Sequence, residues 1–458
     1  MRVALIFPGI SLTGFRSYGT VPESTWIHHG ICMLSACAKA AGHTVKLFDL
    51  RRLSGYRDLV AQVHAYDPDA IGITAMSVEF SIAVRAARAL RRSVSAPIII
   101  GGAHPTLMTD AVAAFDCLDY VLRGEGELAF VELLAALERG EQPPRVQTGE
   151  HPDLDELPFA DRAAFGGPEA ALPVPELPGP LVTLIAGRGC IYNCRFCQPA
   201  EREIFGRSVR RRSVGNVIAE LETIRQAQRM GSVMLHDDCI TENPAWVAAF
   251  CEQYRTAGFD APFICQSRAD LVVKHPDMIA AMAEAGLKML IIGFESGNQR
   301  VLKFLRKGTT VEQNCEAATI CRERNVKIWA NYMLGIPTET REELMDTVRM
   351  IKTINPDVHS PSFYTPHPGT DLYTYCAENN LLPARQTWDR SPHGVKIRGV
   401  DYRFVRWARD EATGIHDLPA RSRARIAVGR ALERVPALKR GLRAVYGASG
   451  VIRGTDQR

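Results

Sequence analysis

The chain of 458 residues lacks any apolar run near the roughly 20 residues that a membrane-spanning helix needs. It also lacks an internal repeat and a low-complexity tract, and its first residues, MRVALIFPGI, are typical of a β-strand rather than a signal peptide. The formal net charge is only +4. These absences argue against a membrane protein and against nucleic-acid binding, and we expect a cytoplasmic globular protein.

Positive charge is concentrated at one end of the chain. Residues 401–458 contain thirteen Lys and Arg but only six Asp and Glu, arranged in a helical pattern. We expect a basic helical extension over residues 391–458. It either packs against the rest of the protein with solvated arginines, or contacts an anionic membrane surface or a carrier protein.

The twelve cysteines are scattered except for one group, Cys190, Cys194 and Cys197, in GRGCIYNCRFC at residues 187–197. Structural zinc normally takes four protein ligands, often as CxxC pairs, and no second pair exists here, although His236 offers a fourth ligand. A four-iron cluster fits this group better. Three thiolates leave one iron open, and an open iron binds a substrate or cofactor.

Residues 1–138 alternate apolar runs with helical patterns, which predicts a Rossmann-like α/β domain with a parallel sheet. Three unusual loops follow the third, fourth and fifth apolar runs, with the sequences TAMSVE, GGAHPT and RGEGE. Ligands of such sheets bind beyond the carboxyl ends of the strands, where glycines allow a close approach to the backbone. We therefore expect a large ligand at these loops.

Residues 139–180 contain nine prolines and are predicted to form an irregular linker. From 181 to 390 the alternation resumes with about six βα units, which predicts a full or partial (β/α)6 barrel. The segments HDD, QSRAD, GFESG and GIPTE fall near the ends of its strands, and the cysteine group follows its first strand. Functional groups are expected at these ends.

The CxxxCxxC spacing, with an aromatic residue before the last cysteine, resembles the signature of the radical S-adenosylmethionine (radical SAM) enzymes. The resemblance implies that the three cysteines hold a [4Fe-4S] cluster whose open iron binds SAM, with flavodoxin or ferredoxin as the electron donor. The Gly-Gly-Glu motif of the family is absent, and HDD at 236–238 stands in its place. The residues that the resemblance places near SAM are Phe196, Asp237, Asp238, Arg268, Glu295 and Gly335.

The N-terminal domain resembles the cobalamin-binding domain of one radical SAM subgroup, through GH-V--FD at 42–49, PDAIGIT, IIIGGAHPT, YVLRGEGE and the later DLDELPF. The Asp-x-His-x-x-Gly motif, which supplies a histidine to cobalt in other proteins, is absent. A nucleotide-binding or vestigial Rossmann-like domain is the alternative, in which His104 simply caps a helix. The implied cobalamin contacts are Met76, Ser77, Gly101, Gly102, His104, Thr106, Gly124, Glu125 and Gly126.

Together these resemblances imply a cobalamin-dependent methyltransferase. A 5′-deoxyadenosyl radical would remove a hydrogen atom from an unactivated carbon or a phosphorus of a small-molecule substrate, and methylcobalamin would deliver the methyl group. Two cofactors on facing domains would both lie within reach of the substrate. Tyr332, Tyr364 and His367, near late strand ends, are candidates for the substrate pocket.

Three other functions remain open. The same cofactors serve radical cyclases that form or contract rings. A methylthiotransferase would need three further cluster cysteines in the N-terminal domain, where only Cys32, Cys37 and Cys117 are available, and the first two resemble helix core residues. An iron–sulfur sensor would bind a cluster without catalysis.

Overall fold

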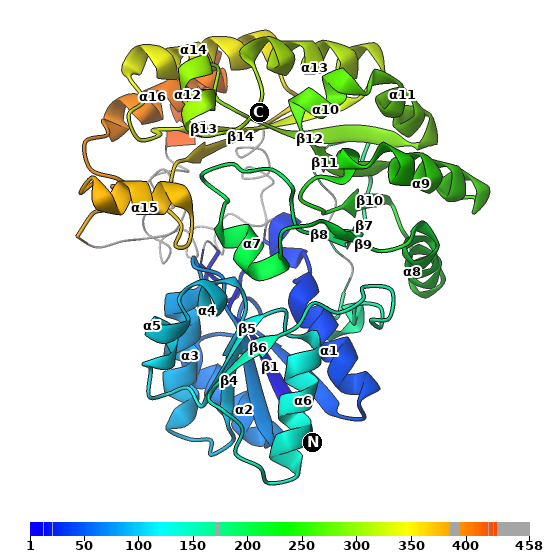
Figure 1. Ribbon diagram of the computed structural model, residues 1–458, viewed down its shortest axis with the longest axis vertical. Helices are drawn as coiled ribbons and strands as arrows, with labels where there is room; N and C mark the ends of the chain where they lie inside the picture. The colour runs from blue at the N-terminus through cyan, green and yellow to red at the C-terminus, as the bar shows by residue number, and fades with distance from the viewer. Residues whose placement is uncertain are drawn as a thin grey trace.

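The computed structural model describes residues 1–427, apart from 12, 21, 168, 170, 171, 173, 385–393, 420 and 425. Two parallel sheets dominate this part of the chain, and helix α7 (Ala200–Phe205) lies between them (Figure 1). Most of the predicted basic tail falls outside the described residues.

The N-terminal sheet has the strand order β2-β1-β3-β4-β5-β6, and all its pairs are parallel. β3 is buried at every position, as expected for a sheet covered on both faces. The predicted Rossmann-like domain is therefore confirmed as an α/β layer structure. Its strands are β1 (Arg2–Phe7), β2 (Thr44–Asp49), β3 (Ala70–Thr74), β4 (Ile98–Gly101), β5 (Tyr120–Gly124) and β6 (Val146–Gly149).

Helices cover both faces of this sheet. α1 and α6 pack together on one face, and α2, α3 and α5 contribute to the core on the other. The strand order reverses between β1 and β3, which places a crevice at the carboxyl ends of these strands. The helices are α1 (His29–Ala40), α2 (Tyr56–Tyr66), α3 (Phe80–Arg91), α4 (Ala103–Leu107), α5 (Thr109–Ala113) and α6 (Glu127–Glu138).

The predicted linker is not irregular throughout. β6 lies inside residues 139–180 and pairs with β5, from Val121↔Val146 to Gly124↔Gly149. Pro143 and Pro144 precede the strand, so no proline removes one of its own N–H donors. The proline-rich composition concealed this edge strand, and the sheet extends to residue 149.

The second sheet has the order β14-β13-β12-β11-β10-β7, again with parallel pairing. Among the described residues its end strands β7 and β14 are not paired with each other, so the sheet forms an open, partial barrel. A short two-stranded antiparallel sheet of β8 and β9 follows β7, and the cysteine loop and α7 lie between its two strands in the sequence. The strands are β7 (Leu181–Leu184), β8 (Gly187–Arg188), β9 (Arg210–Arg211), β10 (Ser232–Leu235), β11 (Phe263–Ser267), β12 (Leu287–Glu295), β13 (Lys327–Leu334) and β14 (Val358–Phe363).

Local sequence signals account for the helix starts in this half. Thr310 and Thr340 each form a capping box with the residue three positions later, which satisfies two free N–H groups at the helix N-terminus. The helices are α8 (Val214–Ala227), α9 (Pro244–Thr256), α10 (Ala269–Lys274), α11 (Pro276–Ala285), α12 (Gln299–Phe304), α13 (Val311–Glu323), α14 (Arg341–Ile354), α15 (Asp371–Glu378) and α16 (Tyr402–Ala412), with 3-10 turns at Pro22–Thr25, Arg162–Phe165, Ile240–Glu242 and Ile415–Asp417.

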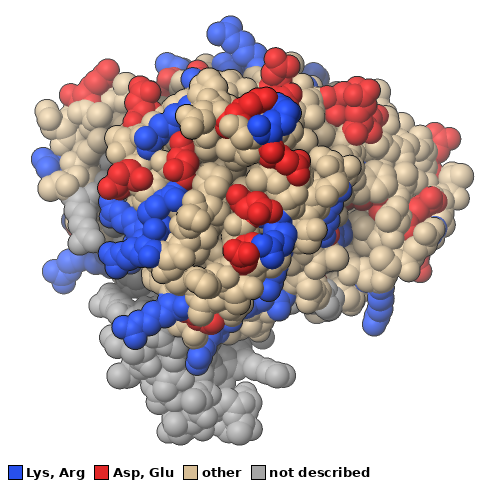
Figure 2. Space-filling view, turned by 90° about the horizontal axis from the view of Figure 1, so that it is seen from below, with Lys and Arg blue, Asp and Glu red and all other residues tan. Residues whose placement is uncertain are grey.

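In the described part of the chain, no helix combines the length and apolar character that crossing a bilayer requires. Figure 2 shows acidic and basic side chains interspersed over the face at the lower end of Figure 1.

Candidate cofactor-binding site

The cysteine loop follows β8 at the carboxyl end of β7. Cys194 is buried, Cys190 is half-buried, Cys197 is exposed, and all three thiols are free. The Cys197 and Gln198 N–H groups donate to the Cys194 carbonyl at 3.0 and 2.8 Å, and the Arg195 N–H donates to the Leu305 carbonyl at 2.9 Å. The first two bonds form a turn within the loop, and the third fixes the loop against the segment after α12.

Arg268, at the end of β11, contacts this loop directly. Its Nη1 donates to the Cys194 sulfur at 3.8 Å, and its guanidinium lies 3.5 Å from the centre of the Tyr192 ring. Its Nη2 also donates to the Lys307 carbonyl at 2.6 Å. Arg268 is therefore a buried cation held against the cysteine loop.

Lys307 is a second buried cation beside the loop, and the sequence analysis missed it. Its Nζ lies 3.0 Å from the Glu295 carboxylate and 6.0 Å from the centre of the Phe196 ring. Three of the predicted SAM contacts, Phe196, Arg268 and Glu295, thus gather with Lys307 around the cysteine loop. The only local signal was a lysine before a glycine in RKGTT, which is common in turns.

The two carboxylates of HDD lie in different surroundings. Asp237 is buried and accepts hydrogen bonds from the Ala186 N–H at 2.7 Å and from Arg211 Nη1 at 3.3 Å, so it connects the end of β10 to the segment after β7 and to β9. Asp238 lines a cavity and hydrogen-bonds to Glu201. Burial raises the pKa of Asp238 and raises that of Glu201 to about 8, which favours one shared proton.

A cavity of about 530 Å³ lies between the two sheets. Gly101, Gly102 and Gly124 of the N-terminal loops line it, and so do Gly187 and Asp238 of the second half. Of the predicted cobalamin contacts, Met76, Gly101, Gly102, Gly124, Glu125 and Gly126 line this cavity, while Ser77, His104 and Thr106 do not.

The ring of His104 is buried away from the cavity wall. It lies 4.1 Å from the Phe80 ring centre, and its Nδ1 is 3.0 Å from Ser77 Oγ. The Thr106 hydroxyl accepts from the Gly124 N–H at 3.0 Å. These side chains therefore support the loops whose glycines face the cavity.

The cavity also extends along the face of the sheet that α1 and α6 cover. Leu5, Gly72, Ile99, Leu122 and Phe130 line this apolar part. A Cβ at Gly72 would lie 2.9 Å from Leu5 and 3.2 Å from Phe130. The missing side chain at Gly72 therefore keeps this space open.

Ion pairs connect the two halves at the cavity. Arg188 of β8 bonds to both Glu125 and Glu127, the latter at 2.7 Å, and Arg210 of β9 also pairs with Glu125. These ion pairs join the loop after β5 to β8, which precedes the cysteine loop, and to β9, which follows it. The charged pairs lie within the molecule, where solvent screens them little.

The remaining predicted residues lie elsewhere. Gly335 has φ +74°, donates to Glu339 Oε2 at 2.9 Å, and faces Val405 of α16. Tyr332 and Tyr364 are buried in two hydrophobic clusters. Tyr332, Tyr364 and His367 do not line the cavity between the sheets.

Comparison with known proteins agrees with this arrangement. The sequence model of the radical SAM superfamily matches residues 184–351, and that of the B12 binding domain matches residues 16–134. An uncharacterized methyltransferase of Pyrococcus horikoshii is 28% identical over 408 residues, which cover 83% of this chain and 84% of that protein. An anaerobic magnesium-protoporphyrin IX monomethyl ester cyclase of Rubrivivax gelatinosus is 26% identical over 81% of this chain and 69% of its own length.

The fold is also shared with a solved structure. The radical SAM methyltransferase TsrM of Kitasatospora setae, solved with cobalamin and a [4Fe-4S] cluster bound, superposes with a TM-score of 0.63 at 19% identity, over 82% of this chain and 75% of that one. The chain is a radical SAM enzyme that also carries a B12 binding domain. Its cofactors are a [4Fe-4S] cluster, SAM and cobalamin.

The described residues fit these cofactors. No three His, Cys, Asp or Glu side chains among them stand in a geometry that holds a single metal ion. The three thiols of one loop, beside two buried cations, instead suit a cluster that leaves one iron open. The glycine-rich cavity wall, with its apolar extension at Gly72, suits a large flat ligand with a projecting side arm.

Proposed function

We propose that this enzyme transfers a methyl group to an unactivated carbon, or to a phosphorus, of a small-molecule substrate. One observation carries the proposal: the cavity between the sheets is lined by both halves, with Gly101 and Gly102 on one side and Gly187 and Asp238 on the other. A substrate in this cavity can reach cofactors held by each half, and such proximity lowers the barrier to transfer.

The chain's own residues supply binding and orientation. Cys190, Cys194 and Cys197 hold the cluster, and Arg268 and Lys307 neutralise charge on its ligands. Phe196, Asp238 and Glu295 border the SAM position, and Asp237 holds the end of β10 through Ala186 and Arg211. The cofactors supply the chemistry of methyl donation and hydrogen-atom removal.

The cobalamin position is assigned to the lining residues of the N-terminal half, which are Met76, Gly101, Gly102, Gly124, Glu125 and Gly126. Ser77, His104 and Thr106 hold these loops in place. Gly335 closes the turn after β13, and Tyr332, Tyr364 and His367 lie outside this cavity. We further propose flavodoxin or ferredoxin as the electron donor.

The test is anaerobic reconstitution of the full chain with iron, sulfide and hydroxocobalamin, followed by SAM and a strong reductant. We expect retained corrin, and 5′-deoxyadenosine that disappears in Cys194→Ala. Retained cluster and SAM cleavage without corrin would remove the methyl-transfer step. A cluster without SAM cleavage would indicate a sensor.

A radical cyclase with the same cofactors is the second candidate, because a cyclase is among the relatives that cover most of this chain. Product mass separates the two reactions. Methyl transfer adds one CH₂ to the substrate, whereas cyclisation does not.

A further inference from the structure

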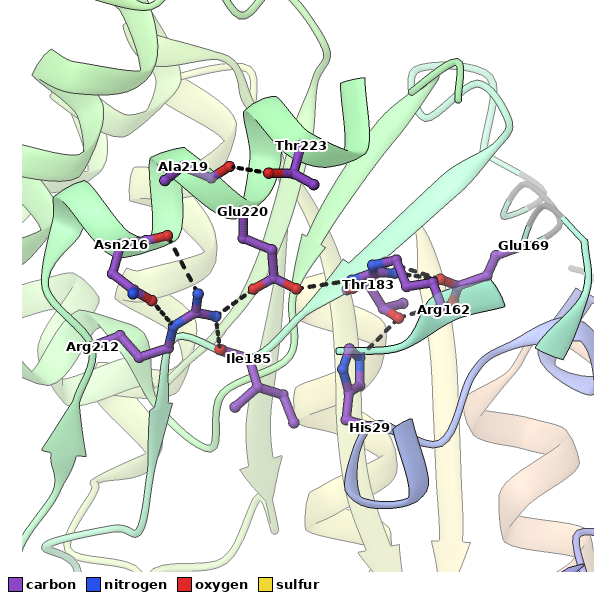
Figure 3. A network of polar contacts seen from close by, with 10 residues as sticks. All are labelled: His29, Arg162, Glu169, Thr183, Ile185, Arg212, Asn216, Ala219, Glu220 and Thr223. Carbon is purple, nitrogen blue, oxygen red and sulfur yellow. Dashed lines mark hydrogen bonds and ion pairs between the residues drawn. The ribbon is translucent and has the colours of Figure 1, made fainter. Parts of the chain in front are cut away.

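His29 begins helix α1 and lines the cavity between the two sheets. Its Nε2 lies 3.0 Å from the hydroxyl oxygen of Thr183 in β7, across 154 residues of sequence. Figure 3 shows the imidazole directly beside Thr183, at one end of a network of polar contacts. A residue of the cobalamin-binding half is thus held by a strand of the radical SAM half.

The hydrogen bonds of Thr183 determine which ring nitrogen of His29 carries the proton. The Thr183 hydroxyl donates its single proton to Glu169 Oε2 at 2.9 Å. The same oxygen must therefore accept from His29, so Nε2 is the protonated nitrogen. In a neutral imidazole the other nitrogen, Nδ1, is then a hydrogen-bond acceptor.

The rest of the network keeps Glu169 in this role. Arg162 Nη1 donates to Glu169 Oε1 at 3.2 Å, and its Nη2 bonds to the Thr183 carbonyl. Glu220 accepts from Arg212 at 2.5 Å and lies 3.9 Å from Arg162 (Figure 3). Arg162 thereby opposes the rise in the pKa of Glu169 that burial causes, which favours the carboxylate.

His29 also stays neutral. Burial lowers its pKa well below the usual value, and the nearby charges of Arg162 and Arg188 and the rings of His28 and His236 act in the same direction. The neighbouring His28 differs in one respect. Its Nδ1 accepts from the Ile31 N–H at 3.2 Å as the N-cap of α1, so that nitrogen is already used.

The cations that line the cavity near His29 are paired. Arg188 bonds to Glu125 and Glu127, and Arg212 bonds to Glu220. A ligand group in this part of the cavity would contact arginines whose charge is already neutralised by glutamates. His29 Nδ1 adds an uncharged hydrogen-bond acceptor. Such an acceptor recognises an N–H or O–H donor rather than an anion.

We propose that His29 is a cobalamin-holding residue whose Nδ1 accepts a hydrogen bond from a primary amide on the rim of the corrin. The inference rests on the proposed function. α1 supports the assignment, because Met33 and Leu34 of the same helix line the same cavity. His29 also lies within the residues that match the B12 binding domain. Amide N–H groups are the donors that the corrin rim offers.

The first test measures hydroxocobalamin affinity of the full chain by ultrafiltration and visible absorbance. His29→Gln keeps a donor near the position of Nε2 but removes the Nδ1 acceptor. We expect its Kd to rise about threefold to tenfold, the effect of one neutral hydrogen bond. The matched control is His64→Gln, an exposed histidine of α2, which should leave the Kd unchanged.

The second test uses the wild-type chain with 15N-labelled histidine, so it does not depend on a variant that folds. The His29 signals should show protonated Nε2 and bare Nδ1, and Nδ1 should shift when hydroxocobalamin is added. Glu169→Gln allows Thr183 to donate to His29, so protonated Nδ1 should appear and the Kd should rise.

A folded His29→Gln variant with wild-type affinity, or protonated Nδ1 in the wild type, would overturn the role of His29 while leaving the proposed function intact. Wild-type protein that retains no corrin would overturn both.

Discussion

Lys307 and Glu295 form a buried ion pair beside the cysteine loop, with Nζ 3.0 Å from Oε1. Removing one partner of such a pair leaves an uncompensated charge inside the protein. Lys307→Met should therefore lower the free energy of unfolding by about 3 to 5 kcal/mol, measured by urea titration.

The exposed Lys303 provides the control for this variant, because Lys303→Met should change the free energy of unfolding by less than about 0.5 kcal/mol. Adding Glu295→Met to Lys307→Met should recover part of the loss. Equal stability of the two single lysine variants would show that the pair contributes nothing.

Arg268 should set the reduction potential of the cluster, because its guanidinium bonds to the Cys194 sulfur. Arg268→Gln removes a positive charge and should make reduction harder, lowering the potential on the order of 100 mV. The measurement is a redox titration followed by electron paramagnetic resonance. The potential of Arg268→Lys should lie between those of the wild type and Arg268→Gln. The potential of Arg255→Gln, a change at an exposed position, should equal that of the wild type. A potential that is the same in all four proteins contradicts the prediction.

Gly72 should control corrin affinity through space alone. The Cβ of Gly72→Ala would crowd Leu5 and Phe130 in the apolar part of the cavity. Overpacking costs about 1 to 3 kcal/mol, so the Kd for hydroxocobalamin should rise roughly tenfold. Gly215→Ala, where a Cβ meets no atom within 4 Å, is the matched control. If both variants bind corrin equally well, the cavity does not accommodate the ligand at Gly72.

His104 should make stability depend on pH. Burial lowers its pKa from 6.5 to about 4, so the unfolded chain binds a proton that the folded protein excludes. The contribution of neutral His104 to the free energy of unfolding is fully present above pH 6.5 and decreases as the pH falls toward 4. Between pH 7 and pH 5 the loss is about 2 kcal/mol.

The measurement compares urea unfolding of the wild type and of His104→Gln at both pH values, which cancels the other titrating groups. The wild type should lose about 2 kcal/mol more than the variant on going to pH 5. If the wild type and His104→Gln lose the same unfolding free energy, His104 is already protonated in the folded protein at pH 5, and burial does not lower its pKa.

The sequence alone determined the features that depend on neighbouring residues. Cys190, Cys194 and Cys197 lie within eight residues, so their spacing by itself indicated a three-thiolate cluster. Alternating apolar runs and helical patterns likewise predicted two parallel α/β units, because the spacing of apolar residues shows which face of a helix or strand is buried. The glycines at strand ends marked the cavity wall for the same reason.

Contacts between distant segments were decided only by the tertiary structure. No local pattern shows that Lys307 lies against Glu295 or that β6 extends the first sheet. The sequence also does not show that Asp237 forms an ion pair with Arg211 while Asp238 faces the cavity. His29 is the clearest case, since its tautomer depends on Thr183, 154 residues away. The sequence gives the chemical type of each side chain, but its protonation, charge pairing and exposure depend on which groups folding brings into contact.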